Sequence, residues 1–397
     1  MSTPPPLPTE RTQTLVIGAG PVGLFAALCA ARRGLQVLLL DRAFRDYAPG
    51  HATLLHGSTL GLLEEGGLAQ QLRAKGQPVE RVTIYLDGAP VTTVALPTPA
   101  LAVPQSALEG VLLDTLRQAG VHVRPAHQAT TLEQNQNHVA VRVMRQERAE
   151  SAEANDDEWQ PVESSLVHAD FVIGADGYDS RVRAALGIEV VEVGSAESFA
   201  MFETPSVEPA SPEGELCIDD ELGSAVLALA EGRRRWAFQI NSRLDALPDI
   251  GRLHALIAER MPRHQNTVDC VDWGTVIQFE RRLSRSFGKR RVWLAGDAAH
   301  VTSPLGSHSM NVGLFEAREL AQRIANSIRD GSSQHLEHYG AEREREWHKL
   351  FGLNVQFNLL PHAPRWLAAH ARRLVPALPA SGPELTDVLA KLGLRLS

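Results

Sequence analysis

Three short clusters of glycine and acidic residues lie far apart along the chain and have the composition of a nucleotide site. They are residues 18–23 (Gly-Ala-Gly-Pro-Val-Gly), 174–177 (Gly-Ala-Asp-Gly) and 296–300 (Gly-Asp-Ala-Ala-His). Glycine permits tight turns and lets the backbone approach a phosphate, and a carboxylate accepts hydrogen bonds from sugar hydroxyls. In this order, the clusters predict a pocket that holds an extended dinucleotide along its whole length.

The first cluster lies inside a predicted strand–helix–strand unit. Residues 14–17 are an apolar run typical of a buried parallel strand, and residues 21–33, rich in Ala and Leu, predict a helix. Residues 36–40 predict the second strand, and Asp41 closes it near the spacing expected of an acid that bonds a ribose hydroxyl. The combination indicates dinucleotide binding far more specifically than a glycine motif alone.

The residues of this cluster have separate expected roles. Gly18 permits the tight turn, Gly20 lets backbone N–H groups approach a pyrophosphate, and Gly23 allows the helix to pack closely on the strand. The helix starts at Pro21 and Val22, so its positive N-terminus would face the phosphates.

The overall composition excludes several classes of protein. A chain of 397 residues with 44% hydrophobic content can bury a large core and predicts two domains. The net charge of −8 and the lack of a basic stripe argue against nucleic-acid binding. No apolar run approaches the roughly 20 residues of a membrane span. Three scattered cysteines (Cys29, Cys217 and Cys270) predict a reduced, cytoplasmic protein, and residues 1–13 predict a flexible N-terminal arm without signal-peptide character.

The segments between the clusters predict two interleaved domains. Residues 106–109 (Ser-Ala-Leu-Glu) form a capping-box pattern ahead of an amphipathic helix, and residues 147–158 are an acidic insertion expected at a solvated hairpin tip. Residues 186–290 alternate short apolar runs with turn residues, as in a β-rich domain, and residues 291–295 return to the nucleotide sheet. Leucines and alanines at helical spacing after Trp347 predict a helical cap.

In their order, these motifs resemble a known family. Over roughly residues 12–345 the chain resembles the single-component FAD-dependent aromatic hydroxylases, the para-hydroxybenzoate hydroxylase-like class of flavoprotein monooxygenases. The resemblance implies an α/β fold: a Rossmann-like FAD-binding domain, an inserted β-rich substrate domain and a C-terminal helical segment. The implied parts are residues 14–75, 101–185 and 280–345 for the FAD-binding domain, 76–100 and 186–279 for the substrate domain, and 346–397 for the C-terminal helical cap.

The resemblance also implies how the cofactor is held. Asp176 would support both the binding of FAD and the approach of the nicotinamide cofactor. Asp297 would form a hydrogen bond with the ribityl chain, and Gln105 would contact the central portion of the FAD. The expected FAD contacts are Gly18, Gly20, Pro21, Val22, Gly23, Asp41, Arg42, His51, Gln105, Asp176, Gly296, Asp297, Pro304, Gly306 and Asn311. No metal site is expected.

The loop after the third cluster departs from the family. The family has Gly-Gly-Gln-Gly where residues 306–309 here are Gly-Ser-His-Ser, although Pro304 and Asn311 keep their spacing. By resemblance, the loop lies beside the flavin ring, and Asn311 opens a helix whose positive end faces the ring. The loop is either a tolerated variant with the same backbone path, or one in which His308 shapes the active site and adds a pH dependence near about 6.5. A third interpretation is that flavin binding or chemistry is lost.

A second departure concerns the segment after Asp41. His51 stands where the family's arginine would contact the pyrophosphate or the flavin edge. A neutral imidazole offers one donor in place of a charged guanidinium. Arg42 or Arg45 could supply the missing charge, so we expect weaker or more mobile FAD rather than its absence.

The activity implied by the resemblance is an NAD(P)H-consuming hydroxylation. NADH or NADPH would reduce FAD transiently, and reduced flavin would react with molecular oxygen to give a C4a-hydroperoxide that hydroxylates an electron-rich aromatic or phenol-like small molecule. The catalytic base is not identified by the sequence, with His308 the one candidate. We expect a monomer or homodimer.

Two other functions remain open. A flavin-dependent halogenase would carry a second Trp and a Pro in the segment that is Trp-Ala-Phe-Gln-Ile-Asn here (residues 236–241), so we interpret this segment as a strand of the substrate domain. A non-redox descendant would use the pocket as a binding module or for cofactor-independent rearrangement. Such a protein would be colourless and would not take up FAD.

Overall fold

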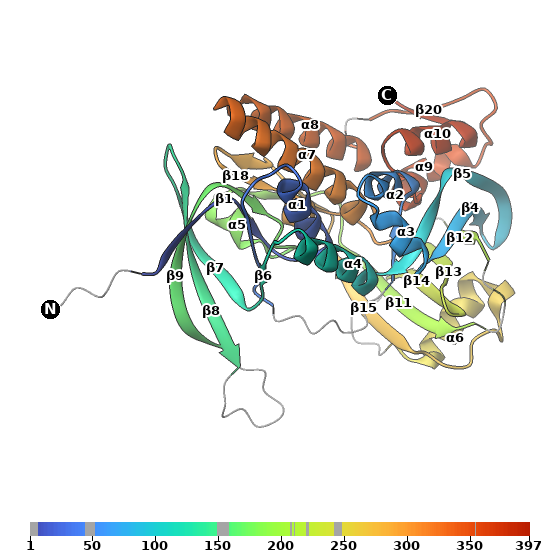
Figure 1. The fold of residues 1–397 in the computed structure, drawn as a ribbon. Helices are drawn as coiled ribbons and strands as arrows, with labels where there is room; N and C mark the ends of the chain where they lie inside the picture. The colour runs from blue at the N-terminus through green and yellow to red at the C-terminus, as the bar shows by residue number, and fades with distance from the viewer. Residues whose placement is uncertain are drawn as a thin grey trace.

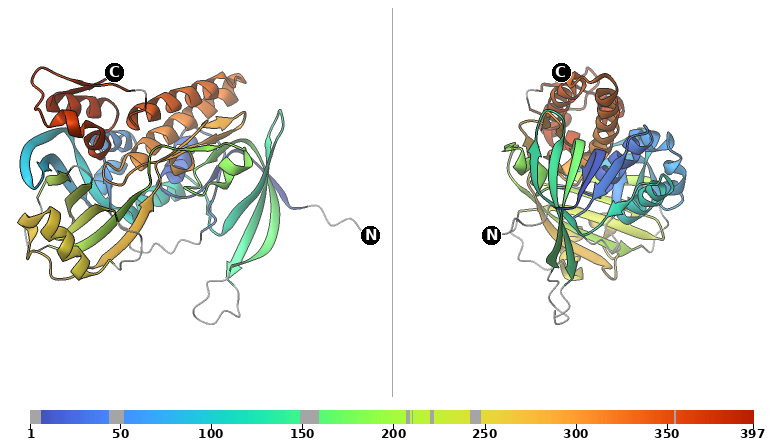
Figure 2. Two further views of the ribbon diagram at one scale, coloured as in Figure 1. Left: turned by 180° about the vertical axis from the view of Figure 1, so that it is seen from behind. Right: turned by 60° about the vertical axis from the view of Figure 1, so that its left-hand side comes forward.

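Two large β-sheets with helices packed around them make up the protein (Figure 1). The structure is a computed structural model that describes residues 7–43, 52–148, 159–206, 209, 211–219, 222–241, 248–353 and 355–397. The first sheet carries the predicted nucleotide site, and the second belongs to the predicted substrate domain. Figure 2 shows the two sheets side by side, with the longest helices running along one side of the molecule.

The first sheet has the strand order β17-β18-β9-β1-β2-β6. β18, β9, β1, β2 and β6 run parallel, and the hairpin of β7 and β8 pairs antiparallel with β9. The bounds are β1 (Thr9–Ile17), β2 (Val37–Leu40), β6 (Val123–Arg124), β7 (His127–Gln134), β8 (Val139–Arg148), β9 (Trp159–Gly174), β17 (Gly288–Lys289) and β18 (Val292–Leu294). Leu15, Val16 and Leu39 are fully buried, as expected of parallel strands covered on both faces.

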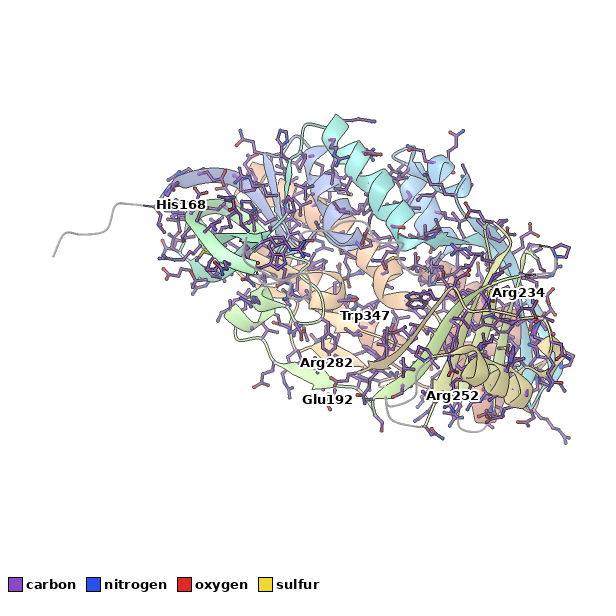
Figure 3. The ribbon with its side chains drawn as sticks, turned by 90° about the horizontal axis from the view of Figure 1, so that it is seen from below. His168, Glu192, Arg234, Arg252, Arg282 and Trp347 are labelled. Atoms are coloured by element: carbon purple, nitrogen blue, oxygen red, sulfur yellow. The ribbon has the colours of Figure 1, made fainter. Side chains whose placement is uncertain are left out.

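The strand β1 is longer than the sequence predicts. It begins at Thr9, so residues 9–13, expected in the flexible arm, belong to the sheet instead. The reason is the length of β9, which extends far enough for Thr9 to pair with Leu166 and Arg11 with His168. Figure 3 shows His168 at this end of the molecule, opposite Arg234 on the second sheet.

Helices cover the first sheet and hold its strand ends together. α1 (Pro21–Ala31) packs against both α4 (Gln105–Gln118) and α7 (His308–Asp330), and α8 (Gln334–Leu350) packs along α7. The expected capping box does not form, because α4 begins at Gln105 directly after β5, with Pro104 at its N-cap. The remaining short elements are α2 (Gly57–Glu64), α3 (Leu68–Arg73), α5 (Arg181–Ala185), η1 (Pro262–His264), η2 (Gly296–Ala298), β10 (Val190–Glu192), β16 (Arg282–Ser284) and β19 (His300–Val301).

The second sheet has the order β15-β11-β14-β13-β12-β4-β5-β3. Its bounds are β3 (Ala52–Leu55), β4 (Gln77–Leu86), β5 (Ala89–Pro104), β11 (Glu197–Pro205), β12 (Glu213–Ile218), β13 (Gly223–Leu229), β14 (Arg233–Ile240) and β15 (Trp273–Phe279). β4 pairs with β12, so β4 and β5 lie in the same sheet as the later strands. β3 also joins this sheet by pairing with β5, although the sequence places residues 52–55 in the FAD-binding domain.

The two faces of the second sheet have different partners because side chains alternate along each strand. Phe202 and Trp236 pack on one face against α6 (Ile250–Arg260). Their neighbours Met201 and Ala237 point to the opposite face, which looks toward the first sheet and its loops. This opposite face carries the cavities described below.

The C-terminal segment forms the expected helical cap over the second sheet. α9 (Leu367–Leu374), η3 (Val375–Ala377) and α10 (Gly382–Leu392) bury apolar side chains against β4, β5 and β12, and β20 (Phe357–Leu359) pairs with β21 (Leu394–Leu396). In the described part of the chain, no helix is both long enough and apolar enough to span a membrane.

Candidate functional site

A cavity of about 440 Å³ lies at the carboxyl ends of β1, β2 and β9. Ligands of open parallel sheets bind at these strand ends. Nine of the expected contacts line this cavity: Gly18, Gly20, Pro21, Val22, Asp41, Arg42, Gln105, Asp176 and Asp297. Segments separated by nearly 300 positions in the chain therefore meet around one space, in agreement with the order of the three clusters.

The three glycines of the first cluster are required for different reasons. Gly18 has φ +104°, and a Cβ there would lie 2.2 Å from the carbonyl oxygen of Ala175. A Cβ on Gly23 would lie 1.8 Å from the carbonyl oxygen of Gly18, so Gly23 permits helix packing and does not line the cavity. Gly20 has φ −70°, which any residue adopts, so it is its lack of a side chain at the cavity wall that matters.

The first turn of α1 provides an anion-binding position. Gly20 is its N-cap and Pro21 its first residue, and no side chain caps the helix. The free N–H groups of such a turn, together with the helix dipole, attract phosphate. The turn borders the cavity, so this part of the site fits a pyrophosphate.

Asp41 lies at the end of β2 and is held by the backbone. Its Oδ2 accepts a hydrogen bond from the N–H of Ala19 (2.8 Å), and its Oδ1 accepts one from the N–H of Ala43 (2.9 Å). A carboxylate oxygen accepts more than one bond, so Asp41 can still take a ribose hydroxyl. Arg42 also lines the cavity, whereas His51 and Arg45 lie outside the described residues.

Asp176 organises the second cluster. Its Oδ1 accepts a hydrogen bond from the Ser180 hydroxyl (2.6 Å), and its Oδ2 accepts from the N–H groups of Arg181 (2.7 Å) and Val182 (3.1 Å). Burial raises the pKa of Asp176, although these hydrogen bonds act in the opposite direction. The carboxylate thus fixes the start of α5 while it lines the cavity.

Asp297 lies deep in the molecule but is exposed to the cavity. The neighbouring Gly296 sets its position. Gly296 has φ +63°, and a Cβ on Gly296 would lie 3.0 Å from the side chain of Val22. Gly296 therefore packs against α1 and lines neither of the two larger cavities of the site. Desolvation raises the pKa of Asp297, with His300 acting in the opposite direction.

A buried network behind the third cluster was not anticipated from the sequence. Glu316, fully buried on α7, accepts hydrogen bonds from the N–H of Gly296 (2.9 Å), the Nε2 of His300 (2.8 Å) and the indole N–H of Trp347 (2.8 Å). The ring of His300 stacks on that of Trp347, 3.7 Å between centroids. Figure 3 labels Trp347 near the middle of the molecule.

The electrostatics of this network favour an ionised Glu316. Burial raises the pKa of Glu316, but His300 and the bonds that His300 and Trp347 donate outweigh it, so the pKa lies below its ordinary value. A sequence signal was present: Glu316 stands four residues from both Val312 and Leu320 on the buried face of the helix. An acid in that position needs a buried partner.

A second cavity, of about 290 Å³, adjoins the first at Thr53, Asp297 and Met310, which line both. Its wall on the second sheet is mostly apolar. Residues 301–305, 307, 309 and 310 close the other side. The residues from the sheet are Ala52, Thr53, Leu54, Ala102, Met201, Ala225, Leu227, Leu229, Arg235, Ala237, Ile277 and Phe279. Pro304, an expected FAD contact, lines this cavity and not the first.

Arg235 is the cation of the second cavity and was also missed. Its side chain is 13% exposed, and its guanidinium donates to Oε1 of the buried Glu203 (3.0 Å), which also accepts from the N–H of Ala52 (2.7 Å). Burial lowers the pKa of Arg235, whereas the negative charge of Glu203 and its hydrogen bond raise it and only partly offset the effect of burial. Arginine stays protonated in proteins, so the wall of this cavity carries one guanidinium, which is ion-paired with Glu203, in addition to the carboxyl group of Asp297.

The loop at residues 306–309 keeps a compact path without the family's glycines. Ser309 lies inside α7, where a side chain is tolerated, and its hydroxyl accepts a hydrogen bond from the N–H of Thr302 (3.0 Å). The positive φ of the loop falls at Ser307 (+53°). A Cβ on Gly306 would lie 2.2 Å from the carbonyl oxygen of Pro376, so this glycine packs against the C-terminal segment and lines neither of the two larger cavities.

The expectation that Asn311 opens the helix is wrong. α7 begins one turn earlier, at His308, because Ser307 already takes the N-cap position. Asn311 is fully buried: its Nδ2 donates to the carbonyls of Leu54 (2.8 Å) and Ser307 (2.7 Å), and its Oδ1 accepts from the N–H of His56 (2.8 Å). It ties α7 to β3 and lines neither of the two larger cavities.

His308 does not line the first or second cavity. It is 2% exposed and borders a smaller cavity, with its ring against that of His56 (5.3 Å between centroids). Burial lowers the pKa of His308 to about 4, with smaller opposing effects from the carbonyls of Leu378 and Val375. This lowered pKa disagrees with the expected titration of His308 near the ordinary value of histidine.

Comparison with known families agrees with the geometry of the first cavity. The family described as "FAD binding domain" matches residues 11–351, most of the chain. The protein belongs to this family. It therefore binds FAD, and the cradle of Gly18 and Gly20, the open first turn of α1 and the exposed Asp297 fit an FAD molecule.

Relatives within the FAD-binding family include named monooxygenases. The chain is 26% identical over 350 residues to 6-methylpretetramide 4-monooxygenase of Streptomyces rimosus, covering 85% of this chain and 60% of that protein. It is 26% identical over 369 residues to pentachlorophenol 4-monooxygenase of Sphingobium chlorophenolicum, covering 86% of this chain and 64% of that protein. The chain thus spans under two thirds of the length of both relatives.

A solved structure shares the fold over nearly the whole chain. The p-nitrophenol 4-monooxygenase of Pseudomonas putida DLL-E4 superposes with a TM-score of 0.71 at 19% identity, covering 98% of this chain and 94% of that one. The FAD-binding domain, the second sheet and the C-terminal helices therefore form an arrangement known from solved flavin monooxygenases.

Proposed function

We propose that the protein is an FAD-dependent monooxygenase that uses NADH or NADPH and molecular oxygen to hydroxylate an electron-rich aromatic or phenol-like small molecule. The observation that supports the proposal is the junction at Asp297, where the first cavity adjoins a mostly apolar cavity of the second sheet. The names of the relatives, which act on aromatic compounds, support the same reaction class.

The residues of the first cavity would hold the FAD in sections. The pyrophosphate would lie at the first turn of α1 beside Gly18 and Gly20, the ribose near Asp41, and the ribityl chain near Asp297. Gln105, whose Nε2 donates to Glu109 (3.0 Å), would face the central portion of the cofactor. The flavin ring would then lie at the junction of the two cavities.

Bound FAD would supply the redox and oxygen-activating chemistry, and the chain would supply position, charge and exclusion of water. The apolar wall of the second cavity would hold the aromatic ring. Arg235 would orient an electron-rich phenol and favour its ionised oxygen, which makes the ring a better nucleophile. The first turn of α7, uncapped at Ser307, would place its positive end beside the same space.

A screen of NAD(P)H oxidation tests this proposal. FAD-loaded protein is mixed with NADH or NADPH in air, with and without a panel of phenols, quinolones and polyketide aromatics. Stimulated oxidation that yields a hydroxylated product supports the proposal, and an Asp297→Ala variant should show weakened FAD binding. A protein that takes up FAD but never oxidises NAD(P)H, or that halogenates the ring when halide is added, contradicts it.

The proposed setting is the cytoplasm, with the protein as a monomer or homodimer. The three cysteines support a reducing compartment, since Cys29 and Cys217 are buried and free and Cys270 is exposed and free.

A further inference from the structure

A third cavity, of about 90 Å³, lies beyond the second along the same face of the second sheet. Part of its wall is the next inward-facing residue on two strands: Gly223, two residues before Ala225 on β13, and Gln239, two residues after Ala237 on β14. Two residues along a strand span about 7 Å. Thr302, Ser303 and Leu305 border both cavities, so the two spaces are consecutive, with the loop closing over them.

This distal cavity differs from its neighbour in charge. Three guanidinium groups line it, from Arg281, Arg372 and Arg373, against a single carboxylate, Glu197. Arg281 and Arg373 donate hydrogen bonds to the carbonyls of Phe351 (3.4 Å) and Asp219 (2.9 Å), and Glu197 is the one carboxylate of the lining that opposes their charge. The lining therefore carries a net positive charge.

A buried polar group without a hydrogen bond also faces this space. His308 is 2% exposed and lines the cavity, and neither ring nitrogen makes a hydrogen bond of ordinary geometry, although the carbonyls of Leu378 and Val375 lie near enough to raise its pKa slightly. Buried polar atoms in proteins nearly always have a partner. An anion in the cavity would provide one, and it would also face the three arginines.

We propose that the distal cavity binds an anionic group, of the carboxylate class, that the aromatic substrate carries on a side arm. This assignment rests on the proposed function, which places the aromatic ring in the second cavity. The arm would span at least the roughly 7 Å between neighbouring inward-facing residues. It would pass Leu305, which packs over Gly223, where a Cβ would lie 2.8 Å from the Leu305 Cδ1.

Matched pairs of ligands test the proposal on the FAD-loaded protein. Hydroxyphenyl alkanoic acids of increasing chain length are compared with their uncharged amides, and binding is measured by calorimetry, independently of turnover. At one arm length, the acid should bind at least tenfold more tightly than its amide. At the shortest arm length, the acid and its amide should bind with similar affinity. An Arg281→Gln/Arg372→Gln double variant should remove that preference.

Two controls separate the outcomes. Arg395→Gln removes an exposed positive charge elsewhere in the C-terminal segment and should keep the preference. Leu305→Ala should widen the range of arm lengths accepted. An equal affinity for acids and amides, or a preference that survives the double variant, overturns the proposal.

A free anion is distinguished by titration with acetate and inorganic phosphate alone. Binding of these ions through Arg281 and Arg372, with no preference for acids over amides, would also overturn the proposal and leave a site for small anions. Failure of the proposed function is a separate result, because it would appear as lack of NAD(P)H oxidation whether or not the acids bind.

Discussion

At the scale of single residues, Gly18 and Gly20 show how one motif combines two requirements. Gly18 is needed by the fold, because its φ is +104° and a Cβ would collide with Ala175. Gly20 is needed by the ligand, because its φ of −70° suits any residue and its surface borders the cavity. The sequence predicts the same division, with Gly18 for the tight turn and Gly20 for the approach of the backbone to a pyrophosphate.

This difference gives the first prediction. Gly20→Val should abolish FAD binding while the thermal unfolding midpoint of the apoprotein changes little, because Gly20 lines the cavity and its φ of −70° suits any residue. Gly18→Ala should lower that midpoint markedly, since a non-glycine residue there is strained and clashes. Flavin absorbance after purification and circular dichroism melts measure both. Stoichiometric flavin in Gly20→Val would mean that the cavity is misassigned.

The buried histidines give a second prediction, about acid stability. Burial lowers the pKa of His308 to about 4 and that of His56 to about 3. At a pH between these pKa values and about 6.5, the unfolded chain binds protons that the folded protein does not. The contribution of the two histidines to the free energy of unfolding is therefore fully present above about pH 6.5 and is lost as the pH falls. His308 alone would account for up to about 3 kcal/mol.

The check is urea unfolding over a pH series. His308→Gln should lose less stability than the wild type between about pH 7 and pH 5, whereas His362→Gln, at an exposed position, should follow the wild type. Parallel curves for wild type and His308→Gln would show that folding does not lower the pKa of His308.

At the scale of elements, α7 determines the geometry of both ends of the site. The first turn of α7 borders the second cavity. Two turns later, Glu316 accepts a hydrogen bond from the N–H of Gly296 and so fixes the turn that carries Asp297. Trp347 from α8 completes the same network. The long helices therefore support the site from behind through Glu316 and Trp347, and α7 also lines both cavities with Met310.

The third prediction concerns the loss of stability and of FAD affinity when Glu316 loses its charge or its hydrogen-bond acceptors. Glu316→Leu should destabilise the protein by about 3 to 5 kcal/mol, because His300, Trp347 and the N–H of Gly296 lose a buried partner. Glu316→Gln should cost less and should weaken FAD binding through a misplaced Asp297. Glu344→Gln, an exposed acid on α8, is the control. Unchanged unfolding and unchanged FAD affinity in Glu316→Leu would refute this role.

The fourth prediction concerns the loop at residues 306–309 and its packing on the C-terminal segment. Gly306→Ala should lower the unfolding midpoint, because its Cβ would lie 2.2 Å from the carbonyl oxygen of Pro376. Gly61→Ala, inside α2 where nothing lies within 4 Å, should be neutral or stabilise by up to about 1 kcal/mol. Equal effects of the two substitutions would contradict the packing of the loop on the C-terminal segment.

At the scale of the whole molecule, the parts that the sequence predicted are those governed by local geometry. The strand and turn around Gly18, the strand that contains Trp236 and the α/β fold follow from short patterns. The pairing of β3 with β5, the ion pair of Arg235 with Glu203 and the burial of His308 against the C-terminal segment join residues far apart in the chain. No local pattern specifies such contacts, so the second cavity's charge and the fate of His308 required the structure.

Labelling with isotopic dioxygen tests the proposed hydroxylation most directly. FAD-loaded protein, NAD(P)H and an aromatic that stimulates NAD(P)H oxidation are incubated under labelled dioxygen, and the product is analysed by mass spectrometry. The predicted result is one labelled oxygen atom on the aromatic ring, dependent on both FAD and NAD(P)H. A product that carries oxygen from water, or one that forms without flavin or reductant, would contradict the assignment of this protein as a flavin monooxygenase.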